Sequence, residues 1–231
     1  MHPDSRVAYW LAGGWPDDAR VGSQSLALRA VLQARSFSGE CLNAGAGEGL
    51  YAAFLESFPG ITGITNIDLV QPSIAQRRKD ARHRDFAGSL THLPFGDAQF
   101  DCGLCTEVLE HITDDELAIE QLARVLKPRG LLLVTVPTGP APFDPAHVRK
   151  GYTLAELSSQ LERHGLVVEA HDFCFYFFMR VLLRVWRWQY VTLGRSRRSL
   201  LPRVVVRAFG FIDRMTRIGQ PWDLVVLARR Q

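Results

Sequence analysis

Residues 43–49 read NAGAGEG, with Gly45, Gly47 and Gly49 at alternate positions. Glycine accepts positive φ and has no side chain, so a ligand can lie close to the main chain of such a loop. A short stretch, GECL at 39–42, leads from a polar segment into the loop, and residues 50–58 after it carry apolar side chains at helical spacing. A strand, a glycine turn and a helix in this order form the nucleotide-binding corner of an open α/β sheet.

The rest of the chain alternates between strand and helix patterns. Strands are expected at 40–43, 63–68, 100–105, 130–136, 166–173 and 222–228, and helices at 50–58, 72–84, 114–125 and 153–164. Thr113 is the expected N-cap of the third helix, and Thr153 with Glu156 forms a capping box for the fourth. Strands and helices of these lengths in alternation predict a mostly parallel, doubly wound α/β sheet.

The spacing of the glycines argues against phosphate ligands. A P-loop needs Lys followed by Ser or Thr, which is missing here, and the dinucleotide pattern G-x-G-x-x-G needs glycine where Leu50 stands. The pattern G-x-G-x-G remains. Asp68 ends the second expected strand, where a carboxylate can bind both ribose hydroxyls of a nucleoside.

Four further sequence features follow the glycine loop along the chain. They are Asp68 itself, Leu93-Pro94-Phe95, CTEVLEHI at 105–112 and RVLKPRGLLLVTVP at 124–137. Together with the glycine loop they resemble the class I S-adenosylmethionine-dependent methyltransferases of the small-molecule type, over roughly residues 40 to 165. The resemblance implies a Rossmann-like, seven-stranded sheet with an antiparallel last strand, and S-adenosyl-L-methionine as cofactor.

The resemblance also implies cofactor contacts for individual residues. The loop from Asn43 through Gly45, Ala46 and Gly47 to Gly49 would carry the methionine portion, although the family usually has an acid where Asn43 stands. Asp68 would bind the ribose and Leu69 would flank the adenine. Ser89 and Leu90 would meet the adenine edge, with Ser89 in place of the usual acid, and Cys105 and Thr106 would offer backbone groups to the methionine amine.

The catalytic candidates follow the expected strands 4 and 5, because open sheets bind ligands beyond the carboxyl ends of their strands. They are His111, His147 and Glu110. We favour His111 as a general base or as a residue that shapes the acceptor site. The alternative is a divalent metal site made of Glu107, Glu110, His111 and His147, since carboxylates with imidazoles suit Mg²⁺ or Mn²⁺, and some methyltransferases with a similar Glu-x-x-Glu-His pattern use a metal.

A basic, aromatic insertion at about residues 176–220 separates the last two expected strands. Residues 173–217 hold ten arginines and one acid, Asp213, whereas the remainder of the chain is acidic. Arg180, Arg184 and Arg187 recur at helical spacing among Trp, Phe, Leu and Val, which predicts a basic amphipathic helix. Such a helix either packs as a lid over the domain or lies on an anionic membrane; its high apolar content argues against nucleic acid.

We therefore expect a helical cap at residues 1–38 and a methyltransferase domain at 39–231 that contains the insertion. The expected function is O-methylation of a small-molecule or lipid-linked acceptor. A nucleic-acid methyltransferase that uses the basic insertion, and a non-catalytic assembly protein that binds S-adenosylmethionine, are the alternatives. The sequence has neither a signal-peptide pattern nor an 18-residue apolar run, and its four cysteines fit a reduced compartment, so we expect a cytoplasmic protein, peripheral on the inner membrane face if the insertion binds lipid.

Overall fold

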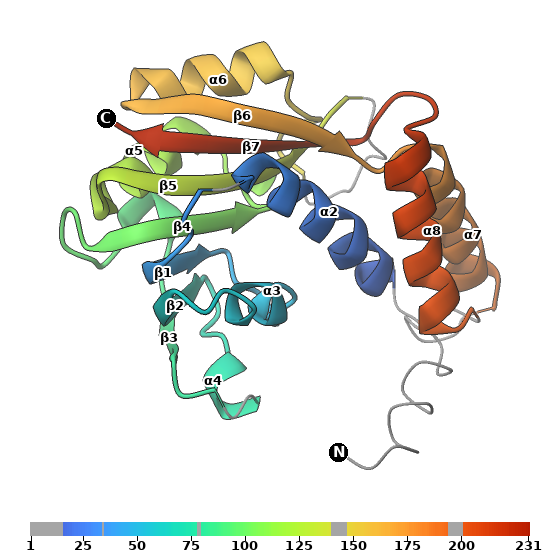
Figure 1. Ribbon diagram of the computed structural model, residues 1–231, viewed down its shortest axis with the longest axis horizontal. Coiled ribbons are helices and arrows are strands. Elements are labelled where there is room, and N and C mark those ends of the chain that lie inside the picture. The colour runs from blue at the N-terminus through green and yellow to red at the C-terminus, as the bar shows by residue number, and fades with distance from the viewer. Residues whose placement is uncertain (1–15, 34, 78–79, 140–146, 194–200) are drawn as a thin grey trace. The chain divides into compact units, whose positions relative to one another are not determined.

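The structure of the protein, a computed structural model, describes residues 16–33, 35–77, 80–139, 147–193 and 201–231 (Figure 1). The chain divides into two compact units. Residues 28–172 and 223–231 make up one unit, and residues 1–27 and 173–222 are assigned to the other. We describe each unit by itself.

Seven strands form a single sheet. They are β1 Gly39–Ala44, β2 Ile61–Asp68, β3 His83–Ala87, β4 Phe100–Thr106, β5 Leu126–Pro137, β6 Leu166–Cys174 and β7 Asp223–Arg230. Their order is β3-β2-β1-β4-β5-β7-β6, in which β7 runs antiparallel to β5 and the pairs between β3 and β5 are parallel. This topology confirms the predicted doubly wound sheet with an antiparallel last strand.

The central strands are apolar and almost completely buried, as expected for strands covered on both faces. The flanking helices are α3 Ala52–Glu56, α4 Ile74–Arg77, α5 Asp115–Val125 and α6 Leu154–Arg163. Two 3₁₀ turns, η1 Leu90–His92 and η2 Leu109–His111, follow the carboxyl ends of β3 and β4. The capping box of α6 is confirmed: Thr153 and Glu156 satisfy each other's backbone N–H groups.

The helix predicted at 72–84 is wrong over most of its length. The described helix α4 spans only Ile74–Arg77, and His83–Ala87 is the edge strand β3. Polar side chains hold β3 to β2: Asn66 Nδ2 donates to Asp85 Oδ1 at 2.9 Å and lies 3.0 Å from His83 Nδ1. Because these contacts join distant parts of the chain, the local apolar pattern carries no sign of them.

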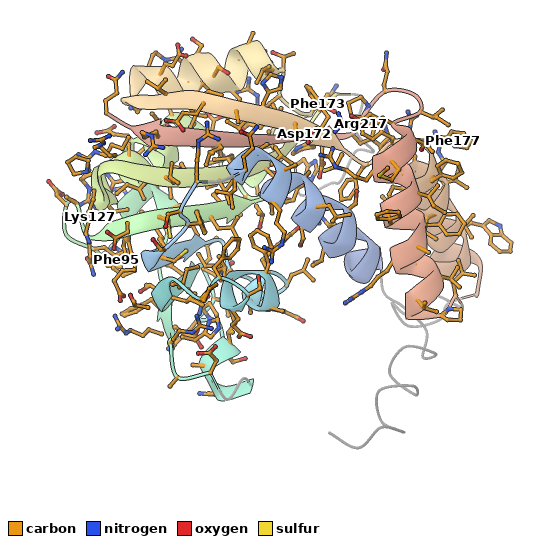
Figure 2. The ribbon with its side chains drawn as sticks, viewed as in Figure 1. Phe95, Lys127, Asp172, Phe173, Phe177 and Arg217 are labelled. Carbon is orange, nitrogen blue, oxygen red and sulfur yellow. The ribbon has the colours of Figure 1, made fainter. Side chains whose placement is uncertain are left out.

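Two smaller predictions also differ from the structure. Asp114, not Thr113, caps α5, because its carboxylate accepts from Leu117 N at 3.0 Å. Strand β5 begins at Leu126, not at residue 130, and contains a register shift in which Arg129 has φ 67°. Lys127, which is labelled in Figure 2, anchors this irregular start. Its Nζ donates to Asp101 Oδ1 at 2.7 Å.

The second unit contains the insertion between β6 and β7, as predicted. Its helices are α7 Phe177–Leu193 and α8 Arg203–Thr216; Gly194, expected to separate them, lies outside the described residues. The buried carboxylate of Asp213 on α8 accepts from Tyr176 N at 2.7 Å and Met179 N at 3.1 Å, so α8 caps the start of α7. Burial raises the pKa of Asp213. At the base of the insertion, Trp222 N donates to the carbonyl of Cys174 at 3.2 Å.

The expected N-terminal cap is described from residue 16 onwards. Helix α2, Pro16–Leu32, occupies most of this segment, and Ala27, Leu28, Val31 and Leu32 are buried. Residues 1–15, the first part of the expected cap, lie outside the described part of the chain.

Candidate active site

The glycine loop follows β1, and its three glycines face different surroundings. Gly45, Gly47 and Gly49 have φ values of 72°, 49° and 81°, a region that favours glycine. A methyl group on Gly45 would overlap the side chain of Val108, and one on Gly49 would come within 2.8 Å of Ile74. A methyl group on Gly47 would meet nothing within 4 Å. Packing therefore accounts for two of the glycines, and Gly47 faces open space in which a ligand can lie.

Asp68 lies beside this loop at the end of β2. Its Oδ2 accepts from Gly47 N at 2.8 Å, so the carboxylate and the open glycine are held together. Leu69, the next residue, exposes 76 % of its surface, an unusual position for a large apolar side chain next to a polar loop. Ser89 caps η1 by accepting from Thr91 N, and Leu90 is buried.

The side chain of Asn43 is turned into the sheet. It is buried and donates to Asn66 Oδ1 at 2.9 Å, which joins it to the polar contacts between β2 and β3. The carboxyl end of β4 brings Cys105 and Thr106, both buried, to the same edge of the sheet as Ala44, because Cys105 pairs with Ala44. Burial, followed by nearby Glu110 and Glu107, raises the pKa of the Cys105 thiol, which stays protonated. The four cysteines are buried and unbridged.

Glu107 begins the turn after β4 with φ 54°. Its N–H donates to Thr135 O at 3.0 Å, and its Oε1 accepts from Thr135 Oγ1 at 2.7 Å. Glu107 is thus bound to the neighbouring strand β5. Among the described residues, one cluster of side chains could hold a metal ion. It consists of Glu110, His111 and His147 and does not include Glu107.

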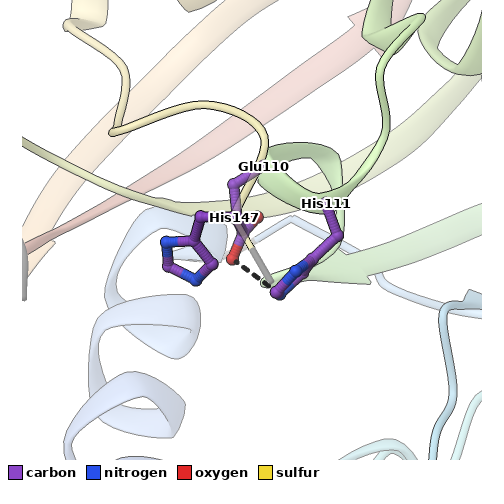
Figure 3. Close-up of side chains that lie close together, drawn as sticks. All are labelled: Glu110, His111 and His147. Atoms are coloured by element: carbon purple, nitrogen blue, oxygen red, sulfur yellow. Dashed lines mark ion pairs between the residues drawn. The ribbon is translucent and has the colours of Figure 1, made fainter. Parts of the chain in front are cut away.

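Glu110, His111 and His147 converge although they come from two distant segments (Figure 3). Their potential ligand atoms all lie within 4.8 Å of one another. The two imidazole rings have centroids 4.7 Å apart and planes at 76°, and His111 Nε2 lies 3.8 Å from Glu110 Oε1. Glu110 is fully buried, His147 is half-buried and His111 is exposed, so the cluster has a buried acidic end and an accessible end with imidazoles.

Backbone hydrogen bonds fix the segment that carries His147. Val148 N and Arg149 N both donate to the carbonyl of Glu110, at 2.9 and 3.2 Å, and Tyr152 N donates to Pro137 O at 2.8 Å. These contacts bind the segment to η2 and to the end of β5. His147 therefore lies next to Glu110 because of main-chain pairing.

Asp115 supports this arrangement from the first turn of α5. One oxygen, Oδ2, accepts from Tyr152 Oη at 2.8 Å, Arg149 at 3.1 Å and Gln160 at 3.2 Å. Burial, and then the hydrogen bond to Asp115, raises the pKa of Tyr152. In the sequence Asp115 is one of the acids in the first turn of a helix, and no local signal predicts its three partners.

The turn after β4 connects the cluster with the glycine loop. Val108, which separates Glu107 from η2, is the side chain that leaves no room for a methyl group on Gly45. Among the described residues, the glycine loop, Asp68 and the Glu110–His111–His147 cluster thus follow the carboxyl ends of β1, β2 and β4. This is the edge at which doubly wound sheets bind their ligands.

Comparison with known proteins agrees with this geometry. Residues 42–134 match the family model described as a methyltransferase domain. The chain is 31 % identical over 154 residues to the O-methyltransferase cnsE of Penicillium expansum, covering 62 % of this chain and 55 % of that protein. It is 32 % identical over 112 residues to the ubiquinone/menaquinone biosynthesis C-methyltransferase UbiE of Haemophilus ducreyi, covering 45 % of this chain and 43 % of that protein. The chain spans about half the length of the curated relatives it matches.

A solved structure shows the same fold. Phosphoethanolamine N-methyltransferase 2 of Haemonchus contortus, in complex with S-adenosyl-L-methionine, superposes with a TM-score of 0.61 at 16 % identity, over 90 % of this chain and 52 % of that one. The family match, the sheet order and the glycine loop facing open space beside Asp68 lead to one conclusion. Over residues 42–134 this chain matches a methyltransferase domain, and its sheet has the fold of the class I, S-adenosylmethionine-dependent methyltransferases.

Proposed function

We propose that the protein transfers the methyl group of S-adenosylmethionine to a hydroxyl oxygen of a small or lipid-linked acceptor. One observation carries the proposal: the turn that bears Glu110 and His111 packs through Val108 against Gly45 of the cofactor loop. A cluster able to handle a proton thus stands beside the loop expected to hold the methyl donor. The names of relatives such as the O-methyltransferase cnsE support oxygen as the acceptor atom.

The cofactor would lie on the loop from Asn43 to Gly49, with its ribose on Asp68. Within the described residues, Gly47 N is the one protein donor to the Asp68 carboxylate, which leaves acceptor capacity for ribose hydroxyls. Exposed Leu69 would cover the adenine, and Ser89 and Leu90 would meet its edge. Cys105 and Thr106 are buried, so they would contribute backbone groups to the methionine end.

The transfer is an in-line displacement, in which the acceptor oxygen attacks the methyl carbon and the sulfonium sulfur leaves with the bonding electrons. The protein has to align these atoms and help the hydroxyl to lose its proton. We assign that second task to His111, His147 and Glu110. Imidazole is suited to it near neutral pH, and the accessible end of the cluster is where His111 lies.

A transfer assay tests the reaction. Protein, S-adenosylmethionine with an isotopically labelled methyl group, and a panel of phenols, hydroxylated lipids, glycans and RNA would be incubated and analysed for labelled product. We expect label on a hydroxylated acceptor, and loss of transfer in His111→Ala with cofactor affinity retained. Label on RNA alone would favour the nucleic-acid alternative. Tight cofactor binding without label on any acceptor would favour a non-catalytic assembly protein.

The insertion supports the second part of the proposal, an acceptor met at a membrane surface. Helix α7 exposes Phe177 (labelled in Figure 2), Val181, Val185 and Trp188, which recur along one side of the helix. Helix α8 and the residues after it expose Val204, Phe211, Ile212, Met215 and Ile218. We call these nine side chains the apolar face of the insertion. None of the described helices is long and apolar enough to cross a bilayer, but an amphipathic helix can bind its surface.

Arginines provide the charge that an anionic bilayer would attract. Arg180 and Arg184 follow the apolar residues of α7 closely in sequence, and Arg207 and Arg217 are exposed on and after α8. The guanidinium of Arg180 lies 4.6 Å from the ring centre of Trp222, that of Arg184 lies 5.9 Å from it, and Arg180 also donates to Gln220 O. Replacing these two arginines would therefore disturb the insertion itself. The apolar face offers a cleaner test.

Vesicle sedimentation tests this part. We expect salt-sensitive binding to vesicles of phosphatidylglycerol and phosphatidylcholine and little binding to phosphatidylcholine alone, since each basic residue near an anionic surface contributes roughly 1 kcal/mol. The triple variant Trp188→Ser/Phe211→Ser/Met215→Ser should lose binding while retaining its melting temperature, because the three side chains are 62 %, 56 % and 69 % exposed. Absence of binding at low salt would leave the insertion as a lid for a soluble acceptor.

A further inference from the structure

We propose that Glu110, His111 and His147 bind one divalent transition-metal ion. This inference rests on the proposed function, because the ion would hold the acceptor hydroxyl at the place where its proton is lost. The starting observation is the convergence of one carboxylate and two imidazoles from two separate segments, with their ligand atoms within 4.8 Å of one another.

The distances fit a site that closes on an ion. Metal bonds of about 2.1 Å place neighbouring ligand atoms roughly 3–4 Å apart. Glu110 Oε1 and His111 Nε2 are already 3.8 Å apart. His111 is exposed, so its ring has room to turn, whereas main-chain hydrogen bonds from Val148 and Arg149 to Glu110 keep the two segments together. Closing the site thus requires side-chain rotation without backbone movement.

The charges favour a cation at this position. Glu110 is fully buried, and a buried carboxylate is costly unless positive charge compensates it. Arg149, two residues after His147, is bound to Asp115 at 3.1 Å and lies 3.7 Å from Glu156. Glu107, the other acid of the turn, is bound to Thr135. A dication between the imidazoles and Glu110 would supply the charge directly.

The ligand set selects the kind of metal. Mg²⁺ and Ca²⁺ prefer oxygen ligands, whereas two imidazoles with one carboxylate suit borderline ions such as Mn²⁺, Fe²⁺, Co²⁺ or Zn²⁺. Three protein ligands leave positions for exchangeable water or an acceptor oxygen. The Mg²⁺ considered from the sequence depended on Glu107 as a fourth ligand, and Glu107 is bound to β5.

The ion would change one step of the transfer. An acceptor hydroxyl bound to a dication loses its proton to solvent more readily, as metal-bound water does. The resulting oxygen forms the new bond to the methyl carbon while the carbon–sulfur bond breaks, and the bonding electrons go to sulfur. The products are the methyl ether, S-adenosylhomocysteine and one proton.

Metal binding can be measured without the reaction. Metal-depleted protein would be titrated with Co²⁺ and followed by its visible absorption, with calorimetry using Mn²⁺ as a second measure. We expect one ion per chain. Loss of a group that merely supports a ligand costs about 10–100-fold in affinity, so Glu110→Gln, His111→Ala and His147→Ala should each weaken binding at least about tenfold. His171→Ala, which removes an exposed imidazole from β6, is the matched control and should bind as the unaltered protein does.

The outcomes separate this inference from the proposed function. Equal Co²⁺ affinity in all variants, or no binding, overturns the metal site. Full methyl transfer by the metal-depleted protein in the presence of a chelator also overturns it, and leaves the proposed reaction standing. Binding that depends on the three residues, without transfer to any hydroxyl, supports the site and refutes the reaction. Transfer lost in chelator and restored by Mn²⁺ or Zn²⁺ supports both.

Discussion

Replacing Gly45 or Gly47 by alanine adds the same methyl group two residues apart, and the structure predicts different consequences. Both residues have positive φ, at which an alanine costs about 1–2 kcal/mol. The methyl group on Gly45 must also displace Val108, and overpacking of this kind costs about 1–3 kcal/mol more. We therefore expect Gly45→Ala to lose about 2–5 kcal/mol of unfolding free energy, and Gly47→Ala about 1–2 kcal/mol.

The two variants should rank in the opposite order for cofactor binding. Gly47→Ala, the more stable of the two, should be the weaker binder of S-adenosylmethionine. The methyl group of Gly47→Ala would point into the open space that we assign to S-adenosylmethionine, so this mildly destabilised variant should lose cofactor affinity by at least about tenfold, or 1.4 kcal/mol. Urea denaturation followed by circular dichroism would give the unfolding free energies. Calorimetry with S-adenosylmethionine would give the affinities.

A double variant supplies the control. In Gly45→Ala/Val108→Ala the clash is relieved, so the two substitutions should be coupled favourably by roughly 1–3 kcal/mol relative to their separate effects. The reasoning fails if Gly45→Ala and Gly47→Ala are equally stable. It also fails if Gly47→Ala binds S-adenosylmethionine as tightly as the unaltered protein.

Three further changes test other contacts. Asp68→Ala should weaken S-adenosylmethionine binding by about 1–3 kcal/mol in calorimetry, the cost of hydrogen bonds left unmade; unchanged affinity would remove Asp68 from the ribose site. Asp115→Ala leaves three donors without their shared acceptor and should cost about 2–4 kcal/mol of unfolding free energy in urea. Asp114→Ala, the control, removes only the exposed helix cap next to it and should cost about 1 kcal/mol. Hydrogen bonds from Arg229 and then Arg35 lower the pKa of Glu169 below its ordinary 4.5. The contribution of these hydrogen bonds to folding stability is therefore complete above pH 4.5. It is lost as the pH falls through the lowered pKa of Glu169. As the pH is lowered, the urea midpoint of Glu169→Gln should decline less steeply than that of the unaltered protein. An identical slope in the two proteins would contradict the lowered pKa of Glu169.

Local patterns in the sequence were sufficient for six of the seven strands and for most helices. The strands β1, β2, β4, β5 and β7 are apolar and buried, so their composition alone marks them. The edge strand β3 reads HRDFA and is held by Asn66 on β2, a contact between residues far apart in the chain. Periodicity describes one segment at a time, and it assigned that stretch to a helix.

The candidate site was predictable in its residue types and less so in its geometry. That the glycine loop and Asp68 contact the cofactor stays a prediction. Packing against Val108 and Ile74 gives Gly45 and Gly49 a structural reason that spacing does not reveal. Glu107 and Glu110 are three residues apart, and both were candidate ligands of one metal site. A positive φ at Glu107 turns it to Thr135 and separates the two acids. His147 joins the cluster through main-chain pairing, which no side-chain pattern encodes.

The two ends of the insertion are hydrogen-bonded to each other, and this affects how its sequence can change in evolution. Trp222 N donates to the carbonyls of Cys174 and Phe175, so the chain leaves β6 and returns to β7 through neighbouring residues. A segment whose ends are joined in this way can lengthen at small entropic cost, because closure entropy grows only logarithmically with loop length. Its internal cap, Asp213, comes from within the segment itself. Recombination could therefore exchange these two helices as a cassette while leaving the register of the sheet and the glycine loop intact.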